Sequence, residues 1–291
     1  MASPDPLLET RQFGRWRVHA IQAGGQQLDG GAMFGVVPKP LWERKIAADP
    51  RNRIPMGMRC LLIEHDLGLV LLDTGAGNKE PEKFYDIYGI ENARRDGSTA
   101  LEDGIRQAGH DPADVQWVIN THLHFDHAGG NTVRDGDTVR PTFPNATYVV
   151  QLGEYLYATH TNERTAASYF APNFVPLFED ERLDLVTGKT MILPGVTVLP
   201  TPGHVPHHQS VLLQSGGETL CFLGDVVPTA HHLPLPWIMG YDVEPLVTLE
   251  SKRWLLREAA EEGWTVVFEH DAHTSFGRVS HGEKGYGLAA V

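Results

Sequence analysis

Thr121-His122-Leu123-His124-Phe125-Asp126-His127 stands directly after an apolar run of the kind that forms a buried strand. Alternate residues of an extended segment point to the same side, so His122 and His124 can share one metal ion. Asp126 and His127 follow where the chain turns, and they can face a second ion. Imidazole nitrogen and carboxylate oxygen are ordinary ligands of zinc and similar divalent ions. Taken alone, the segment leaves open a structural zinc site or a chance surface cluster.

Three later segments repeat this arrangement. Thr201-Pro202-Gly203-His204 puts a histidine in a tight turn after a predicted strand, and Phe222-Leu223-Gly224-Asp225 puts a carboxylate at the end of another. Phe268-Glu269-His270-Asp271 ends the last predicted strand with one more histidine. Each candidate ligand therefore stands at the C-terminal end of a strand, where α/β sheets collect functional groups. Four such segments argue against a chance cluster.

The pattern of apolar residues predicts an α/β layered fold. Strands are expected at residues 16–21, 59–64, 68–73, 115–120, 147–151, 196–199, 209–213, 219–223 and 265–268. Helices are expected from an N-cap at Ser98 to near Gly109, at 155–170 and at 244–262. Two long connections interrupt these elements, a loop at 28–55 without regular structure and a polar insertion at 75–97. We expect a single domain over residues 1–291.

Composition and charge exclude several classes of protein. The chain has 291 residues, a hydrophobic fraction of 41% and a formal net charge of −13. The acidic balance argues against a nucleic-acid partner, because nucleic-acid binders carry a basic footprint. The sequence shows neither a signal-peptide pattern at its start nor an apolar run of about 18 residues, so we expect a cytoplasmic protein without a membrane partner. Cys60 and Cys221 lie in apolar runs and are expected to be buried thiols.

The ordered motifs HLHFDH, TPGH, GD and EHD, preceded by LLDTG at residues 71–75, resemble those of the metallo-β-lactamase superfamily. The resemblance implies an αββα sandwich, in which two mixed β-sheets lie face to face with helices outside. It also implies a ligand set for two metal ions. The first ion would be held by His122, His124 and His204, the second by Asp126, His127 and His270, and Asp225 would bridge both.

The same resemblance gives two other side chains a supporting role. Asp73 would orient a metal ligand by hydrogen bonding, and His208 would support the turn that carries His204. His231 and His232 come within seven residues of Asp225, so one of them could line the site. His273 is expected to lie outside the ligand set.

Two segments point to one branch of this superfamily. Residues 28–42 and 234–242 resemble the branch that includes the quorum-quenching N-acyl-homoserine lactonases. Their apolar side chains would form a pocket for an acyl chain beside the metals, or they could simply pack the domain. The pocket candidates are Met33, Phe34, Trp42, Trp237, Met239 and Tyr241. The first segment could also form the contact of a homodimer.

One position departs from the lactonase pattern. Some lactonases of this fold place a tyrosine three residues after the bridging aspartate to stabilise the oxyanion, and here that residue is Pro228. The oxyanion would then be held by a metal alone, or by Tyr241, His231 or His232. Arylesterases and organophosphate hydrolases of the same fold also lack this tyrosine, so those activities stay open. A non-catalytic metal-binding sensor is a further class.

The expected activity is metal-dependent hydrolysis, with N-acyl-homoserine lactones opened by a hydroxide that bridges two metal ions. Asp225 and Asp126 are the catalytic candidates, Asp225 as the bridging ligand and Asp126 as proton donor to the leaving alkoxide. Zinc is the expected metal, with iron, manganese and cobalt as alternatives. The expected partner is a small lactone or ester.

Overall fold

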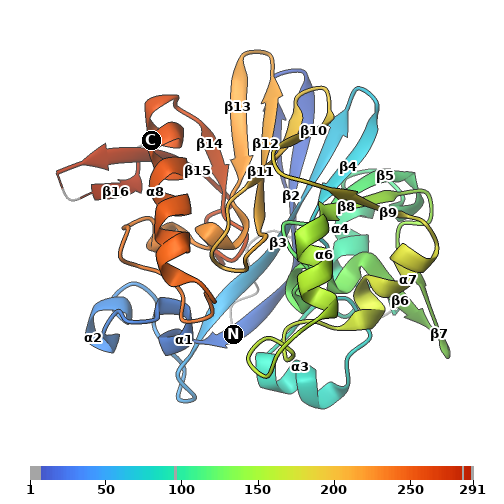
Figure 1. Ribbon diagram of the computed structural model, residues 1–291, viewed down its shortest axis with the longest axis horizontal. Helices are drawn as coiled ribbons and strands as arrows, with labels where there is room; N and C mark the ends of the chain where they lie inside the picture. Colours follow the sequence, from blue (N-terminus) through green and yellow to red (C-terminus); the bar gives the residue numbers. More distant parts are fainter. Residues whose placement is uncertain (1–7, 95–96, 284, 290–291) are drawn as a thin grey trace. The chain divides into compact units, whose positions relative to one another are not determined.

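The computed structural model describes residues 8–94, 97–283 and 285–289. The chain divides into two compact units. The first unit comprises Met1–Gly25 and Met58–Gly188, and the second comprises Gln26–Gly57 and Lys189–Val291. Each unit has its own mixed β-sheet with helices against it (Figure 1).

The sheet of the first unit has the strand order β1-β2-β3-β4-β5-β8-β9. Its strands are β1 Leu8–Phe13, β2 Trp16–Asp29, β3 Arg53–His65, β4 Gly68–Leu72, β5 Val115–Ile119, β8 Thr147–Gln151 and β9 Leu183–Val186. The pairs β1/β2 and β3/β4 are antiparallel, whereas β4, β5, β8 and β9 run parallel to one another. Parallel strands present their C-terminal ends at one edge, which is where Asp73 and the segment after β5 stand. A separate hairpin joins β6 Thr132–Asp135 to β7 Thr138–Pro141.

Helices of the first unit pack against this sheet. They are α3 Glu82–Tyr88, α4 Ala100–Gln107, α5 Phe125–Ala128, α6 Leu152–Thr159 and α7 Val175–Glu179, with 3-10 turns η1 Pro112–Asp114, η2 Gly129–Asn131 and η3 Ala171–Asn173. Leu101 and Ile105 of α4 belong to the same buried core as Ile21 and Leu71 of the strands. Gly104 lies between them on α4, where a Cβ atom would stand 2.2 Å from the Ile21 side chain. Glycine is therefore required for this close approach of helix and sheet.

The second unit contains a sheet of order β10-β11-β12-β13-β14-β15-β16, antiparallel except for the pair β13/β14. Its strands are β10 Thr190–Leu193, β11 Val196–Pro200, β12 Gln209–Ser215, β13 Glu218–Phe222, β14 Thr265–Val267, β15 Phe276–Gly282 and β16 Gly285–Leu288. Its helices are α1 Gly30–Phe34, α2 Lys39–Trp42 and α8 Pro245–Glu261, with 3-10 turns η4 Gly224–Val226 and η5 Ala230–His232. Leu255, Leu256 and Ala259 of α8 share a core with Val266 and Phe268, so α8 covers one side of this sheet.

Every predicted strand is present, and three expectations about helices and loops were wrong. The helix expected at 155–170 ends at Thr159, because the chain folds back and brings Tyr169 to the carboxylate of Glu154. The loop at 28–55 is not irregular, since it contains α1 and α2 and the start of β3. The N-cap of α4 is Thr99 rather than Ser98, because Thr99 forms a reciprocal capping box with Glu102.

Smaller differences have local causes. The strand predicted at 68–73 ends at Leu72, because Asp73 has a left-handed backbone with φ of 51°. The polar insertion at 75–97 contains α3, whose Phe84 and Tyr88 pack on Phe125. Short strands such as β6 and β7 were not predicted, since four-residue segments carry little periodicity. Both cysteines are buried thiols, as expected.

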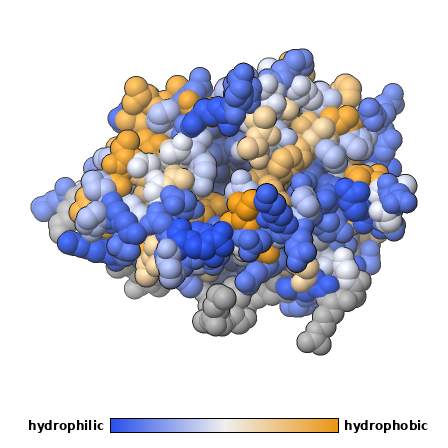
Figure 2. All heavy atoms as spheres, turned by 90° about the horizontal axis from the view of Figure 1, so that it is seen from below, coloured by the Kyte–Doolittle hydropathy of each residue, from blue (hydrophilic) through white to orange (hydrophobic). Residues whose placement is uncertain are grey.

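Several apolar side chains of the described residues are exposed. Val36 is 92% exposed and Leu246 is 76% exposed, and Leu41 is partly exposed as well. Figure 2 shows apolar groups gathered in patches between polar side chains on one face. Among the described residues, no helix is both long enough and apolar enough to cross a membrane.

Candidate metal centre

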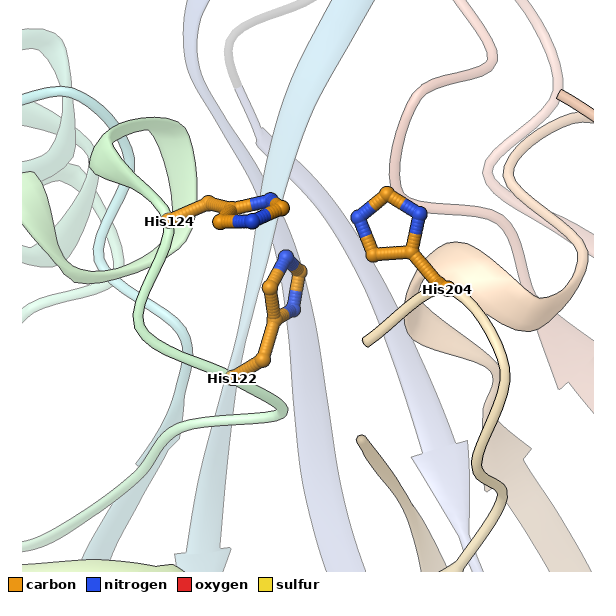
Figure 3. Close-up of side chains that lie close together, drawn as sticks. All are labelled: His122, His124 and His204. Carbon is orange, nitrogen blue, oxygen red and sulfur yellow. The ribbon is translucent and has the colours of Figure 1, made fainter. Parts of the chain in front are cut away.

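The segment after β5 carries four of the candidate ligands. His122 and His124 project from the loop, and Asp126 and His127 lie on the short helix α5 that follows. The rings of His122 and His124 lie close together (Figure 3). Their centroids are 4.5 Å apart, and those of His122 and His127 are 4.0 Å apart. All four side chains are largely buried. The first unit therefore brings together all the ligands that the HLHFDH motif predicted.

Asp73 holds this loop in place from the end of β4. Its Oδ1 atom accepts the backbone N–H of Thr121 at 2.8 Å, and its Oδ2 atom accepts the Thr121 hydroxyl at 2.7 Å. His127 Nδ1 lies 3.1 Å from the same Oδ2 atom. A carboxylate only accepts hydrogen bonds, so His127 carries its proton on Nδ1 and presents a lone pair at Nε2.

The tautomer of His122 follows from the same contacts. Because the Thr121 hydroxyl donates to Asp73, its oxygen accepts from His122 Nδ1, which lies 3.0 Å away. His122 therefore also presents its Nε2 lone pair. The left-handed backbone of Asp73, with φ of 51°, is a conformation that few residues other than glycine, asparagine and aspartate adopt. Such strain is commonly kept where function requires a fixed geometry.

Glu154 supports the loop that carries His122 and His124, and the sequence did not predict it as a site residue. It is fully buried on α6, and its Oε1 atom accepts the backbone N–H of Leu123 at 3.0 Å. The same oxygen accepts the Tyr169 hydroxyl at 2.9 Å. The Tyr169 ring in turn packs against the His124 ring, with centroids 4.7 Å apart. Glu154 lies outside every sequence motif, so only its three-dimensional contacts reveal it.

His204 stands on the turn after β11 in the second unit (Figure 3). Gly203, with φ of 132°, allows this turn, because a Cβ atom there would lie 2.1 Å from the backbone nitrogen of Thr248 on α8. The Nδ1 atom of His204 lies 2.9 Å from Oδ1 of Asp242. His204 is therefore protonated at Nδ1, and Asp242 is a buried partner that the sequence motifs did not assign.

Asp225 lies between two histidines of the second unit. Its Oδ2 atom is 3.0 Å from His204 Nε2, and its Oδ1 atom is 3.0 Å from His270 Nε2. The Nδ1 atom of His270 lies 2.8 Å from the carbonyl oxygen of Gly57, which can only accept. Two imidazole lone pairs therefore face the two oxygens of one carboxylate. This contact is repulsive unless protons or cations are shared there, which suits a bridging metal ligand.

His208 supports the start of η4 through a chain of hydrogen bonds. Its Nε2 atom accepts the backbone N–H of Asp225 at 3.0 Å, so Nδ1 carries the proton and donates to Thr201 Oγ1 at 2.8 Å. Thr201 Oγ1 lies 3.0 Å from Ser210 Oγ, which donates to the carbonyl oxygen of Leu223 at 2.9 Å. His208 thus uses both ring nitrogens within the fold.

The donor set fits divalent metal ions. His122, His127, His204 and His270 are each tied at Nδ1 to an oxygen and present Nε2. This is how protein histidines are oriented for zinc and related ions, with an outer hydrogen bond that fixes the tautomer. The carboxylates of Asp126 and Asp225 stand beside these nitrogens, with Asp126 Oδ1 at 3.8 Å from His127 Nε2.

Three of the aromatic candidates for a substrate pocket, Phe34, Trp42 and Trp237, form one cluster in the second unit. Phe34 stacks on Trp42 with centroids 5.6 Å apart and meets Trp237 edge to face at 5.5 Å. Met33, Phe34, Trp42 and Met239 are buried, whereas Tyr241 is exposed and Trp237 is half-buried. Residues 28–42 and 234–242 are joined directly, because the N–H of Gly240 donates to the carbonyl oxygen of Ala32 at 2.7 Å.

His232 and Lys252 hold this cluster together. The His232 ring stacks on Phe34 with centroids 4.7 Å apart, and its Nε2 atom donates to the Met33 carbonyl oxygen at 2.8 Å. Burial lowers the pKa of His232 to about 3, so the ring is neutral. Lys252 of α8 donates to the carbonyl oxygens of Pro234 and Trp237, both at 2.8 Å.

Three further residues considered in the sequence, His231, His273 and Pro228, are described by their burial or their backbone hydrogen bonds. Burial lowers the pKa of His231, which is only partly buried. The backbone N–H of His273 donates to Asp271 at 3.0 Å. Pro228 accepts the backbone N–H of His270 through its carbonyl oxygen at 2.9 Å. The residue that replaces the expected tyrosine thus anchors a candidate ligand through its backbone.

The family described as "Metallo-beta-lactamase superfamily" matches residues 57–270, which include every candidate metal ligand. The chain belongs to the metallo-β-lactamase superfamily. Membership agrees with the ordered histidine and aspartate motifs and with the mixed sheets flanked by helices. The protein is accordingly a metal-dependent hydrolase of this superfamily.

This chain is similar to several named proteins. An N-acyl homoserine lactonase from Bacillus sp is 30% identical over 234 residues, which cover 76% of this chain and 84% of the relative. A probable metal-dependent hydrolase from Staphylococcus aureus has a TM-score of 0.85 at 28% identity. The alignment covers 97% of this chain and 99% of the hydrolase. AidC, a dizinc quorum-quenching lactonase solved with a product, has a TM-score of 0.81 at 18% identity. The alignment covers 98% of this chain and 97% of AidC.

Proposed function

We propose that this metallo-β-lactamase superfamily enzyme is a dinuclear lactonase that opens N-acyl homoserine lactones. The observation that carries the proposal is the set of four histidines tied at Nδ1 and presenting Nε2 beside two aspartates. The substrate class rests on the relatives named N-acyl homoserine lactonase at 30% identity. We also propose that the two units act as one functional domain, since the family match runs through both.

The proposed ligand set follows from these side chains. His122, His124 and His204 would hold one ion, Asp126, His127 and His270 the other, and Asp225 would bridge them. Zinc is the proposed metal, because nitrogen and carboxylate donors suit it and AidC, which has the same fold, is dizinc. When bound, two such ions lower the pKa of a water molecule toward neutrality and polarise a substrate carbonyl.

The protein's own residues complete the proposed reaction. Hydrolysis adds the hydroxyl of water to the lactone carbonyl carbon, breaks the ring C–O bond and leaves an alkoxide that needs a proton. Asp126 is the proposed carrier of that proton: its carboxylate would take the proton that the water loses and pass it to the alkoxide, as it lies on α5 beside His127. Asp73 and Asp242 keep their histidines in the tautomer that the reaction requires.

The hydrogen bonds of His232 reduce the number of candidates for the group that donates a hydrogen bond to the oxyanion. His232 is excluded, because its Nε2 atom donates to the Met33 carbonyl and its Nδ1 atom lies 2.7 Å from the Thr229 hydroxyl. Tyr241, which is 38% exposed, and His231 therefore remain as the proposed donors besides a metal. We assign Tyr241 and the half-buried Trp237 to substrate contact. Met33, Phe34, Trp42 and Met239 would then form the wall behind them.

The first test is a pH-stat assay of the metal-loaded enzyme with short-chain and long-chain N-acyl homoserine lactones. We expect proton release that a chelator abolishes and that added Zn²⁺ restores. An aryl ester and an aryl phosphotriester serve as comparison substrates. Turnover of either comparison substrate without lactone opening would refute the lactonase assignment in favour of an arylesterase or organophosphate hydrolase. Two bound ions per chain without any turnover would indicate a non-catalytic sensor.

The homodimer and the cytoplasmic location stay predictions. The exposed Val36 and Leu41 on the segment after α1 are consistent with an apolar contact between two copies. Sedimentation of the wild type beside a Val36→Ser variant tests the dimer, since a dimer formed through this segment would weaken in the variant. Cell fractionation tests the location.

A further inference from the structure

A second group of possible metal ligands lies in the first unit, away from the candidate metal centre. His19 on β2, Glu64 on β3 and His110 after α4 bring three ligand atoms within 4.8 Å of one another. One oxygen, Oε1 of Glu64, lies 3.0 Å from Nε2 of His19 and 3.0 Å from Nε2 of His110. The proposed function uses none of these side chains.

The spacing suits a metal ion. Neighbouring ligands of an ion with bonds of 2.0 to 2.1 Å are separated by about 2.9 Å in octahedral and about 3.4 Å in tetrahedral geometry. The two contacts of Glu64 Oε1 fall in this range. The His19 side chain is 2% exposed, whereas those of His110 and Glu64 are 26% and 24% exposed. Solvent can therefore reach the site and supply the remaining ligands.

The protonation states of His19 and Glu64 also favour the binding of a metal ion. Burial lowers the pKa of His19 despite the neighbouring carboxylate, so the ring is neutral at neutral pH. Burial raises the pKa of Glu64, but hydrogen bonds from His110 and His19 and the charge of Arg17 outweigh this and keep it below its ordinary value. Metal ions bind neutral imidazole and ionised carboxylate. Thr10 Oγ1 lies 2.9 Å from His19 Nδ1 and can fix the ring tautomer.

We propose that His19, Glu64 and His110 form a site for one divalent transition-metal ion, separate from the dinuclear centre. Zn²⁺, Co²⁺ and Ni²⁺ are the ions that suit two imidazoles and one carboxylate. The site stands at the end of β4 where His65 pairs with Gly68, and Asp73 follows the other end. Glu64 pairs with Leu69 of β4, and the four residue steps from Leu69 to Asp73 span about 13 Å at the rise of a strand.

An ion there links three segments that are distant in sequence. It would join β2 and β3 to the connection between α4 and β5, and so stabilise the folded state in proportion to its occupancy. Arg17 opposes it, because Arg17 Nε lies 3.3 Å from Glu64 Oε2 and carries positive charge. Removing the charge of Arg17 should therefore raise the affinity for the ion. The proposal thus predicts tighter binding for this change and weaker binding when a ligand is replaced.

The test is equilibrium dialysis of the full-length, two-metal enzyme against rising free Zn²⁺, with bound zinc measured by elemental analysis. We expect one further ion per chain in the wild type. His110→Ala and Glu64→Gln should lose it, Thr10→Val should bind it about 10- to 100-fold more weakly, and Arg17→Gln about three- to fivefold more tightly. His160→Ala removes an exposed histidine of the same unit and is the matched control.

Thermal unfolding and lactone hydrolysis provide independent readouts. Added Zn²⁺ should raise the melting temperature of the wild type and of His160→Ala, but not that of His110→Ala. Lactone hydrolysis should be equal in all three, so failure of the lactonase proposal would leave this test intact. Equal zinc binding by the wild type and His110→Ala, or binding of only two ions by the wild type, would overturn the proposal and leave the three side chains as a hydrogen-bonded cluster.

Discussion

Asp242 offers a direct test of how the protein prepares its metal ligands. Its Oδ1 atom accepts a hydrogen bond from His204 Nδ1 at 2.9 Å, and the two side chains are only 1% and 2% exposed. Without this carboxylate the His204 ring can rotate or change tautomer, and its Nε2 atom becomes less basic. Replacement of Asp242 should therefore weaken metal binding without removing any ligand.

The size of the effect follows from the buried contact. A hydrogen bond between a charged group and its partner contributes about 1.5 to 3 kcal/mol, and 1.36 kcal/mol corresponds to about tenfold in affinity. Asp242→Ala should thus weaken binding of the ion assigned to His122, His124 and His204 by about 100-fold. Asp242→Asn keeps an acceptor oxygen but loses the charge, so about tenfold is expected.

The assay is competition for metal with a chromogenic chelator, followed by lactone hydrolysis under saturating metal. Glu250→Gln, an exposed position on the same unit, is the control and should match the wild type. Excess metal should restore most of the turnover of both Asp242 variants. Metal affinity within twofold of the wild type in a folded Asp242→Ala protein would refute the role assigned to this carboxylate.

Three further predictions follow from other contacts. Asp225→Asn should leave the fold intact but reduce bound metal below two ions per chain and abolish turnover, since Asp225 lies 3.0 Å from both His204 and His270; full metal content with full activity would exclude the bridging role. Glu154→Ala should lower the free energy of unfolding by about 2 to 4 kcal/mol, because buried groups of Leu123 and Tyr169 lose their acceptor, whereas Glu154→Gln should lose less in the same denaturant titration. The pKa of His232 falls from 6.5 to about 3 on folding. Between these pH values the unfolded chain binds a proton that the folded chain does not, so the free energy of unfolding is full above pH 6.5 and decreases as the pH falls toward 3. Between pH 8 and pH 5 the wild type should lose about 2 kcal/mol more than His232→Gln in metal-free unfolding experiments, and equal losses would contradict the shift.

Much of this protein is determined by its sequence. The ligand segments could be found because each follows an apolar strand and contains residue types that bind metals at short spacing, as in residues 122–127. The order of these segments along the chain predicted the superfamily, and the family match agrees. Local signals also predicted α8 within one residue at each end. One local signal was overlooked, since Thr99 and Glu102 have the spacing of a capping box.

Only the tertiary structure identified the partners of those ligands. Asp242 lies 38 positions from His204 and Glu154 lies 31 from Leu123, and neither separation follows a helical or strand period. Gly57 reaches His270 across 213 positions through a backbone carbonyl, which no residue type can signal. Such contacts depend on how strands and loops pack, and hydrogen bonding at the ring nitrogens then fixes the histidine tautomers. The sequence thus determined which side chains can bind metal, and folding decided which atoms they present.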